Sequence, residues 1–466
     1  MNFRKTPLIV ALILLLPMIS LGQNIQLYNA DYLPQSLMMN PGADVDFDKH
    51  FGIPLLSGVH AQFGSTGISF HDIYKNDPAQ TINERIGDAL LSLSRKDYFT
   101  VSQHLEILSV GWRDKKDRYF SAGWYEELDA FTYFPKDAAI LAYYGNADYI
   151  DRYFDFSDIN GRGELLSVFH IGVNKKVSDK LTLGGRFKIY SSMLNATSID
   201  NTGRFITTST PEGNNFYRQS ILGLDASLKL SGIDRDEDLT AANVLPNAIG
   251  GGNYGAGVDL GMSYKIGRQW QMTASLVDLG MIFHQSKTRE IYANGDYDFE
   301  GVGFIFPEVG EDDTVKSYFN DLRNDFKDNV RTGKGPSDSY TTLRPVKFYG
   351  SLEYRFGAPP YCNCLNPDED NYRFRTGLSV FAVKRPRTAQ ASVTGYLDAK
   401  LLDFLHTKLT YTVDPFTTTN IGFLVSAQIN KFNLYLSADN LLEYQNLAKA
   451  RTASLQFGFQ FIINND

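Results

Sequence analysis

The chain has 466 residues, 13% of them aromatic, and a formal net charge of -8. This acidic balance argues against a general nucleic-acid binder. A mean hydropathy of -0.25, without a second run of about 18 apolar residues after the N-terminus, argues against a helical membrane protein. The 27 Tyr, 32 Phe and 39 Gly residues suit a β protein with aromatic girdles and tight turns.

The first residues have the layout of a secretory signal peptide. MNFRK is basic, PLIVALILLLPMISL is apolar, and small residues precede Gln23, which we expect to begin the mature chain. An uncleaved membrane anchor is the alternative. The following stretch YLPQSLMMNP (32–41) is too apolar for a disordered leader, so we expect the rest of the fold to hold it.

Apolar and polar side chains alternate along many segments, as they do in strands that separate two environments. In 455–461 the rings of Phe457, Phe459 and Phe461 share one face, and Gln456 and Gln460 share the other. Fourteen strands are expected, near 57–70, 98–113, 118–133, 164–177, 180–191, 254–266, 269–283, 341–356, 372–384, 388–401, 405–414, 417–429, 431–440 and 451–463.

The connections between these strands are of two kinds. Tight turns are expected at 114–117, 178–180, 267–268 and 430–431, whereas the other connections are long. The long ones hold two expected helices, within 71–97 and 315–330, and a hairpin within 192–252, which must lie outside the barrel if the strand count is to stay even. Trp112 and Trp270 lie beside tight turns, where a membrane-interface girdle would place them.

A soluble sandwich with charged outer faces also fits the alternation. Three features favour an all-β, single antiparallel transmembrane β-barrel of about 14 strands. They are the signal peptide, the division into short turns at one end and long loops at the other, and the position of the two tryptophans. Its short turns would be periplasmic, and its long loops, with short helices, would be extracellular. The expected division is a signal peptide at 1–22, an N-terminal segment at 23–56 that plugs the lumen, the barrel at 57–463 and a tail at 464–466.

The polar face of the strands carries many full charges. These form either a basic passage for an anionic solute or a ladder of salt bridges in a plugged barrel, and charges of opposite sign at similar depth favour the ladder. The charged side chains expected to face the lumen are Glu106, Arg186, Lys188, Asp259, Lys347, Glu353, Arg355, Arg373 and Arg375.

Motifs for chemistry are sparse. No HExxH, GxSxG or Walker loop occurs, so we predict no catalytic residue, no metal site and no cofactor. His104 beside Glu106 is the best remaining candidate pair for a hydrolase. Cys362 and Cys364 are too few for a disulfide framework or a zinc site, although an exported chain allows them to form a local disulfide.

Several phrases resemble a known family. They are SLMMNPGADVDFDKHFGIPLLSG (36–58), KKVSDKLTLGGRFK (175–188), LVDLGMIF (276–283) and LYLSADNLLEY (434–444). Together they resemble a Bacteroidetes family of outer-membrane barrels of unknown function, and more distantly the PorP/SprF proteins of type IX secretion and the FadL-like barrels. The resemblance implies a location in the cell outer membrane and no catalytic residue. The last residues, Asn464 to Asp466, depart from the aromatic end common in barrels.

The leading hypothesis is a non-enzymatic outer-membrane barrel that acts as a structural or interaction component of the cell envelope, associated with type IX secretion or surface machinery. The alternative is a FadL-like transporter or pore for a small amphipathic or anionic solute. The expected partners are outer-membrane lipid and envelope proteins, with no nucleic acid.

Overall fold

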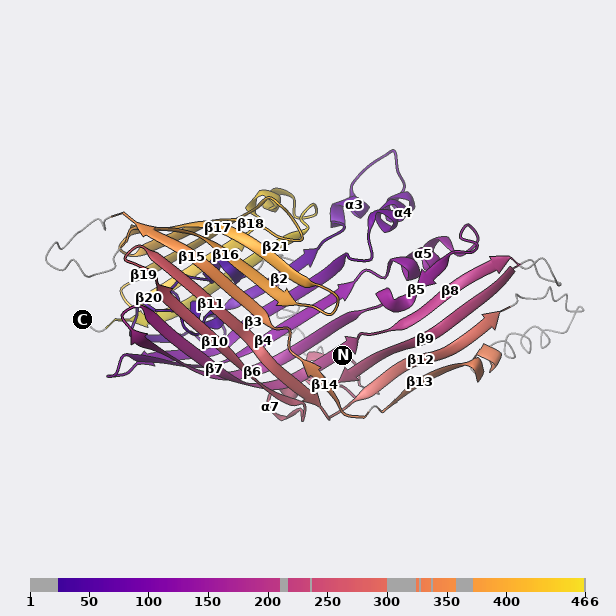
Figure 1. Ribbon diagram of the computed structural model, residues 1–466, viewed down its shortest axis with the longest axis horizontal. Coiled ribbons are helices and arrows are strands. Elements are labelled where there is room, and N and C mark those ends of the chain that lie inside the picture. Colours follow the sequence, from indigo (N-terminus) through magenta and orange to yellow (C-terminus); the bar gives the residue numbers. More distant parts are fainter. Residues whose placement is uncertain are drawn as a thin grey trace, which may run out of the picture.

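Fourteen antiparallel strands close into a single barrel, which confirms the predicted fold class (Figure 1). The structure, a computed structural model of the chain, describes residues 24–209, 217–234, 237–299, 324–326, 328–336, 338–357 and 372–464. The expected signal peptide, the pair Cys362 and Cys364, and most of the helix expected within 315–330 lie outside the described residues.

The wall strands follow the chain order around the ring, and β21 closes it by pairing with β1 and β2. They are β1 (Lys49–Gly52) with β2 (Val59–Ser65), β3 (Tyr98–Arg113), β4 (Arg118–Tyr133), β6 (Gly161–Ser178), β7 (Leu181–Ser198), β10 (Tyr254–Lys265), β11 (Trp270–His284), β14 (Tyr340–Leu343) with β15 (Lys347–Phe356), β16 (Phe374–Lys384), β17 (Ala389–Leu402), β18 (Leu405–Val413), β19 (Asn420–Ile429), β20 (Phe432–Asp439) and β21 (Thr452–Ile463).

Two wall strands are interrupted. β1 and β2 pair with the same neighbours, so residues 49–65 act as one strand with a break at 53–58. β14 and β15 both pair with β11, and the break between them contains Pro345, which has no N–H to donate to a ladder. The wall therefore begins at Lys49, inside the range 23–56 assigned above to the N-terminal segment.

The two ends of the barrel differ in their connections. Residues 114–117, 179–180, 266–269, 403–404 and 430–431 join strands at one end, called the short-turn end below. The opposite, long-loop end carries α3 (Phe70–Tyr74), α4 (Ile82–Ser92), α5 (Lys136–Tyr144), β5 (Tyr153–Asp155), η2 (Phe156–Asp158), α6 (Ala241–Val244), α7 (Asn247–Gly250) and η3 (Leu441–Asn446).

The helix expected within 71–97 is α4, and a capping box begins it. Thr81 Oγ1 accepts a hydrogen bond from Glu84 N, and Glu84 Oε2 accepts one from Thr81 N at 2.7 Å. The helix thus starts where the sequence supplies partners for its first free N–H groups.

A small sheet extends beyond the barrel at the long-loop end (right in Figure 1). It consists of β5, β8 (Thr202–Ser209), β9 (Tyr217–Ser231), β12 (Arg289–Phe299) and β13 (Val330–Pro336), paired in that order. β9 also pairs with β7 over Asn195–Thr197, so this sheet continues the wall beyond the long-loop end. The hairpin expected within 192–252 therefore lies outside the ring, as the even strand count requires.

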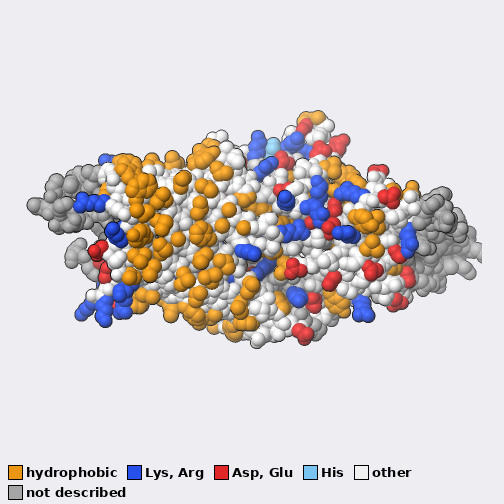
Figure 2. All heavy atoms as spheres, in the orientation of Figure 1, with side chains coloured by type: hydrophobic (Ala, Val, Ile, Leu, Met, Phe, Trp, Pro, Cys, Tyr) orange, Lys and Arg blue, Asp and Glu red, His pale blue; other side chains and the backbone are white. Residues whose placement is uncertain are grey.

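The outer surface of the barrel carries an apolar band (orange in Figure 2). On β21, Phe461 is 39% exposed on this surface, whereas Gln456 and Gln460 are buried on the inner side. The same division recurs along the wall, with Leu378 on β16 62% exposed and Ser379 buried. No helix among the described residues is long and apolar enough to cross a membrane.

Candidate functional site

Residues 24–48, called the plug below, fill much of the barrel interior. The plug contains two short helical turns, η1 (Asn24–Leu27) and α2 (Ser36–Met39), and is otherwise irregular. Its side chains Ile25, Leu27 and Leu33 are at most 2% exposed. They belong to a cluster with the wall residues Val277, Tyr349, Phe381, Val383, Leu424 and Tyr435.

Wall side chains bind the plug backbone along its length. An irregular segment has carbonyl groups that its own secondary structure does not satisfy, so they need partners when buried. The donors are Lys408 to Tyr28 O (2.6 Å), Arg186 to Met38 O (2.6 Å), Ser275 to Met39 O (2.6 Å), Ser263 to Gly42 O (2.8 Å), Asn174 to Ala43 O (2.8 Å), and Arg113 to Val45 O (2.8 Å) and Phe47 O (3.3 Å). The wall is therefore built to hold this particular segment.

Two glycines let the plug approach the wall backbone directly. A Cβ atom at Gly184 would lie 1.9 Å from Pro41 O, and one at Gly261 would lie 2.1 Å from Asn40 Oδ1. Any other residue at either position would push the plug away from β7 or β10.

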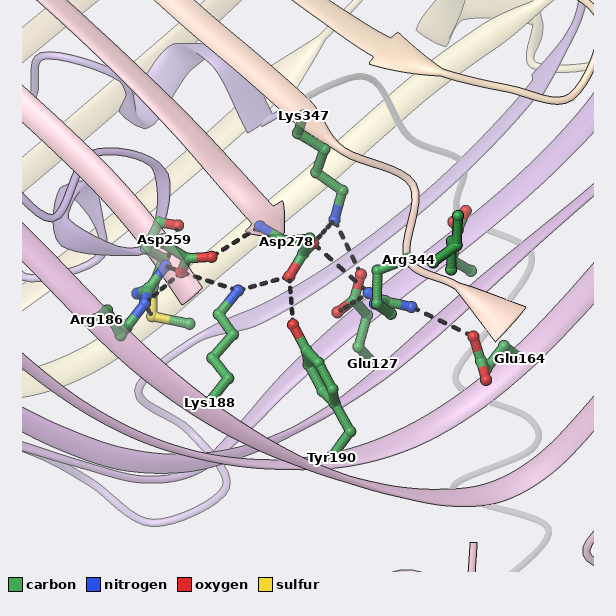
Figure 3. A network of polar contacts seen from close by, with 12 residues as sticks. Glu127, Glu164, Arg186, Lys188, Tyr190, Asp259, Asp278, Arg344 and Lys347 are labelled. Atoms are coloured by element: carbon green, nitrogen blue, oxygen red, sulfur yellow. Dashed lines mark hydrogen bonds and ion pairs between the residues drawn. The ribbon is translucent and has the colours of Figure 1, made fainter. Parts of the chain in front are cut away.

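Eight charged side chains form a continuous network on the inner wall, called the wall network (Figure 3). Asp278 is its centre: its carboxylate lies 2.6 Å from Lys188 Nζ and 2.9 Å from Lys347 Nζ. The members are the acids Glu127, Glu164, Asp259 and Asp278 and the bases Arg186, Lys188, Arg344 and Lys347. Arg162 adds a fifth base at the edge of this network, 2.6 Å from Glu164. Since every base contacts an acid, the arrangement is a salt-bridge ladder and not a basic passage.

A second group of ion pairs ties the plug to the neighbouring part of the wall, on β15, β16 and β17. Asp31 of the plug binds Arg375 and lies 3.4 Å from Arg355, and these arginines also contact Asp398 and Glu353. Burial raises the pKa of Asp31, but the charges of Arg375 and Arg355 outweigh burial and hold it below its ordinary value. Asp31 is therefore a fixed negative charge. The group of Asp31, Glu353, Arg355, Arg375 and Asp398 is called the plug network.

The structure places most of the charged side chains expected in the lumen within these groups. Arg186, Lys188, Asp259 and Lys347 lie in the wall network, and Glu353, Arg355 and Arg375 in the plug network. Glu106 is 3% exposed, and its Oε2 accepts a hydrogen bond from Gln35 of the plug at 3.1 Å. Arg373 lies just before β16, with its guanidinium 5.4 Å from the centre of the Phe374 ring.

Other expected residues lie apart from the networks. Trp112 and Trp270 are 47% and 46% exposed at the short-turn ends of β3 and β11. The two residues of the candidate hydrolase pair contact different partners: the His104 ring lies 4.4 Å from the Tyr125 ring, centre to centre, whereas Glu106 binds the plug.

Sequence reasoning missed Asp31, Glu127, Asp278, Arg344 and Lys408. Asp278 adopts a positive φ of 64° beside an irregularity in the β10–β11 pairing, so simple alternation does not give its direction. An available signal was the single acid within the apolar run LVDLGMIF. Asp31 lies in a segment without periodicity, so its contacts with distant arginines leave no local pattern.

A cavity of about 140 Å³ lies between the plug and the long-loop end. Leu27, Gln35 and Met39 of the plug line one side. The barrel-wall side chains that line the cavity are of two kinds. The aromatic ones are Tyr125, Tyr349 and Phe381, and the charged ones include Glu127, Asp278, Lys188 and Lys347. Among the described residues, Gln35 Oε1 and Gln390 Nε2 are buried here without a hydrogen-bond partner, so the lining offers both an acceptor and a donor.

The turn between β16 and β17, residues 385–388, closes over the cavity and is called the mouth turn below. Arg385 lines the cavity and donates two hydrogen bonds to Asp129 on β4, at 2.8 and 3.0 Å. Arg387 binds Asp158 at 2.9 Å and stacks 5.0 Å from the centre of the Tyr133 ring. Phe416, from the β18–β19 connection, packs beside Tyr98 at 5.6 Å.

No group of three His, Cys, Asp or Glu side chains in the described part of the chain could hold a metal ion.

A sequence model of the family of unknown function DUF5723 matches residues 41–439. The chain belongs to this family. Comparison with curated protein sequences gave no match. The DUF5723 chain is similar to several solved structures. One is the toluene transporter TodX of P. putida, with 10% identity, 93% of this chain and 95% of that chain covered, and a TM-score of 0.41.

Two further structures illustrate the range of similarity. A Pseudomonas aeruginosa FadL homologue has 10% identity, covers 92% of this chain and 94% of its own, and gives a TM-score of 0.39. The translocator domain of the autotransporter NalP from Neisseria meningitidis has 6% identity, coverages of 90% and 89%, and a TM-score of 0.31.

Proposed function

We propose that this chain is a non-enzymatic outer-membrane protein that passes a small amphipathic solute through the barrel interior, and that the plug must move for the solute to cross. The cavity between the plug and the mouth turn carries this proposal. Its 140 Å³ is close to the volume of about 150 Å³ that accommodates benzene in an engineered apolar cavity.

The lining indicates the chemistry of the solute. Tyr349 and Phe381 offer apolar and aromatic contact, and Gln35 and Gln390 offer a free acceptor and a free donor. Because the charged side chains that line the cavity are three acids and three bases, the cavity favours a neutral or zwitterionic molecule over an anion. A compact molecule with an apolar body and one or two polar groups matches this surface best.

The test locks the plug to the wall. Asn29 Nδ2 of the plug lies 2.5 Å from Ser351 Oγ of β15, so cysteines at these positions can be joined by a short cleavable thiol crosslinker. Cys362 and Cys364 are first replaced by serine. Solute uptake by vesicles, or conductance in planar bilayers, should fall to background on crosslinking and return after cleavage.

A matched control places the same crosslink within the wall, at Thr394 and Thr412, whose Oγ1 atoms are 2.8 Å apart on β17 and β18. This pair should leave passage unchanged. Silence of the folded uncrosslinked protein in both assays would overturn the transport proposal, and passage through the plug-locked protein would overturn plug movement.

A second candidate is the structural or interaction role, including association with type IX secretion or surface machinery. The sheet of β8, β9, β12 and β13 beyond the barrel supports it, because this sheet offers a broad surface outside the ring. Replacing residues 203–223 by a short linker should keep the barrel folded and abolish crosslinks to a defined envelope protein. Unchanged crosslinks, or crosslinks to barrel-assembly proteins alone, would count against this role.

A further inference from the structure

Basic side chains gather where two neighbouring turns meet at the short-turn end. The segments 113–118 and 175–180 carry seven basic and three acidic side chains, although the whole chain has a formal charge of -8. The turns are adjacent because β4 pairs with β6, with Arg118 directly opposite Lys175. Lys115, Lys116, Lys175 and Lys180 are all exposed. These four lysines and Arg118 are called the basic patch.

The nearby acids do not cancel this charge. Asp114 is bound by Arg118 at 2.6 Å, and Asp117 by Arg113 at 2.8 Å. Arg113 also lies 3.2 Å from Asp48, so it is shared by two acids, but the four lysines face only Asp179 within the two segments. The basic patch is therefore suited to an anionic partner.

An aromatic pair lies beside the patch on the outer face. Trp112 and Phe120 stack at 5.7 Å, and the Arg118 guanidinium lies 5.3 Å from the centre of the Phe120 ring. Tryptophan beside basic residues, next to an apolar band, is the arrangement that favours the interface between lipid headgroups and hydrocarbon. The patch thus lies at headgroup depth if the band lies in hydrocarbon.

An apolar groove of about 640 Å³ begins at Lys175 and crosses the outer face from β6 to β15. The strand registers align its floor, since Val173 is opposite Gly185, and Gly185 is opposite Leu260, followed by Leu276 and Phe348. Five adjacent strands span about 19 Å at ~4.8 Å each, so the groove is long and runs across the tilted strands.

The groove is open over Gly185. A Cβ atom at Gly185 would meet nothing closer than 3.8 Å, so the space above this glycine is open and a side chain could fill it. Leu183 and Met262 line the groove near Gly185, and Ala274 on β11 has a short side chain that leaves space there. The groove therefore has an apolar lining and an open space over Gly185 that can take a hydrocarbon chain.

We infer that this surface binds one anionic phospholipid from the leaflet at the short-turn side. Its phosphate and acidic headgroup lie among Lys115, Lys175 and Lys180, and one acyl chain lies in the groove over Gly185. The inference rests on the membrane placement proposed above. A lipid fits better than a protein or a free anion, because the basic patch and the apolar groove are continuous at Lys175.

The full mature chain is tested by native mass spectrometry in detergent, with phosphatidylglycerol and phosphatidylcholine supplied at equal concentration. One phosphatidylglycerol should remain bound per barrel. The variant Lys115→Gln/Lys175→Gln/Lys180→Gln should bind it at least about tenfold more weakly, because each basic residue near an anionic lipid surface contributes about fivefold. The control Lys96→Gln/Lys384→Gln/Lys449→Gln changes three exposed lysines at the long-loop end and should bind as the unchanged protein does.

The groove is tested separately by Gly185→Leu, which should lower retention of phosphatidylglycerol. Its control is Gly395→Leu on β17, where a Cβ atom would also meet nothing closer than 3.7 Å.

Equal retention of both lipids, or full retention by the triple-lysine variant, would overturn the headgroup assignment. Full retention by Gly185→Leu would overturn the acyl-chain assignment. Failure to insert into any vesicle, including pure phosphatidylcholine, would instead overturn the membrane placement.

Discussion

Arg385 and Asp129 join opposite sides of the barrel mouth. Arg385 follows β16 and Asp129 lies on β4, six positions away in the ring of fourteen strands, yet the guanidinium donates two hydrogen bonds to the carboxylate at 2.8 and 3.0 Å. Both side chains are buried, at 7% and 8% exposure. The pair therefore fixes the mouth turn over the cavity, and its loss should first increase access to the cavity through the mouth.

Arg385→Gln should open the mouth without unfolding the barrel. Removing one partner of a buried pair leaves an uncompensated charge and costs about 3–5 kcal/mol. The measurement is the labelling rate of a cysteine introduced at Ser102 in the cavity lining, using a membrane-impermeant thiol reagent in the background without Cys362 and Cys364. We expect an increase of at least about tenfold. In the double variant Arg385→Gln/Asp129→Asn no charge is left alone, so labelling should return toward the original rate; equal rates in all three proteins would contradict the role of the pair.

Gly184→Ala should displace the plug, whereas Gly185→Ala should not. The new Cβ atom at position 184 would lie 1.9 Å from Pro41 O, but at position 185 the nearest atom is 3.8 Å away. Hydrogen exchange of the amides in residues 30–45 reports on the plug, and heat-modifiable gel mobility reports on the barrel. We expect faster exchange for Gly184→Ala with the mobility shift retained. Similar exchange in the two variants would show that the plug does not pack on β7 as described.

The barrel could be predicted because its determinants are local. Alternation along strands such as 455–461 gives the two faces, and the short turns give the parity, so the strand count and order follow from the sequence. The rule fails where the backbone departs from regular geometry. Asp278 lies at a positive φ, and the β14–β15 strand breaks at Pro345, and no periodic pattern assigns a direction to side chains at such points.

The interior depends on contacts between residues far apart in the chain. Asp31 meets Arg375, and Lys408 binds the carbonyl of Tyr28. Composition indicates that the apolar N-terminal stretch must be buried against the rest of the fold, but it does not indicate which wall residues contact it. The contact between Arg385 and Asp129 could not be predicted for the same reason, because only the closed ring brings these two residues together.

Lys408→Met should loosen the first part of the plug. Lys408 is 1% exposed, its Nζ donates to Tyr28 O at 2.6 Å, and it lies 4.3 Å from the centre of the Tyr396 ring. Methionine keeps the length of the side chain and removes the donor, so the carbonyl loses its partner at a cost of about 1–3 kcal/mol. Limited proteolysis with N-terminal sequencing should detect cleavage within 24–33 at least several-fold faster. Lys400→Met, on β17 near the short-turn end, is the control and should be cleaved at the original rate.

Leu378→Arg tests whether the apolar band faces lipid. Leu378 is 62% exposed on β16, with Leu352 and Gly395 opposite it on the two neighbouring strands, so in water an arginine there would be harmless. In a bilayer an outward arginine near the midplane costs about 2–4 kcal/mol. We expect lower yield of folded barrel in vesicles and a lower urea midpoint for Leu378→Arg. Ile291→Arg, equally an outward apolar-to-arginine change but on β12 beyond the ring, should fold as the unchanged protein does. Equal folding of the two variants in vesicles would mean that the band is not in hydrocarbon, and the proposed membrane placement would fail with it.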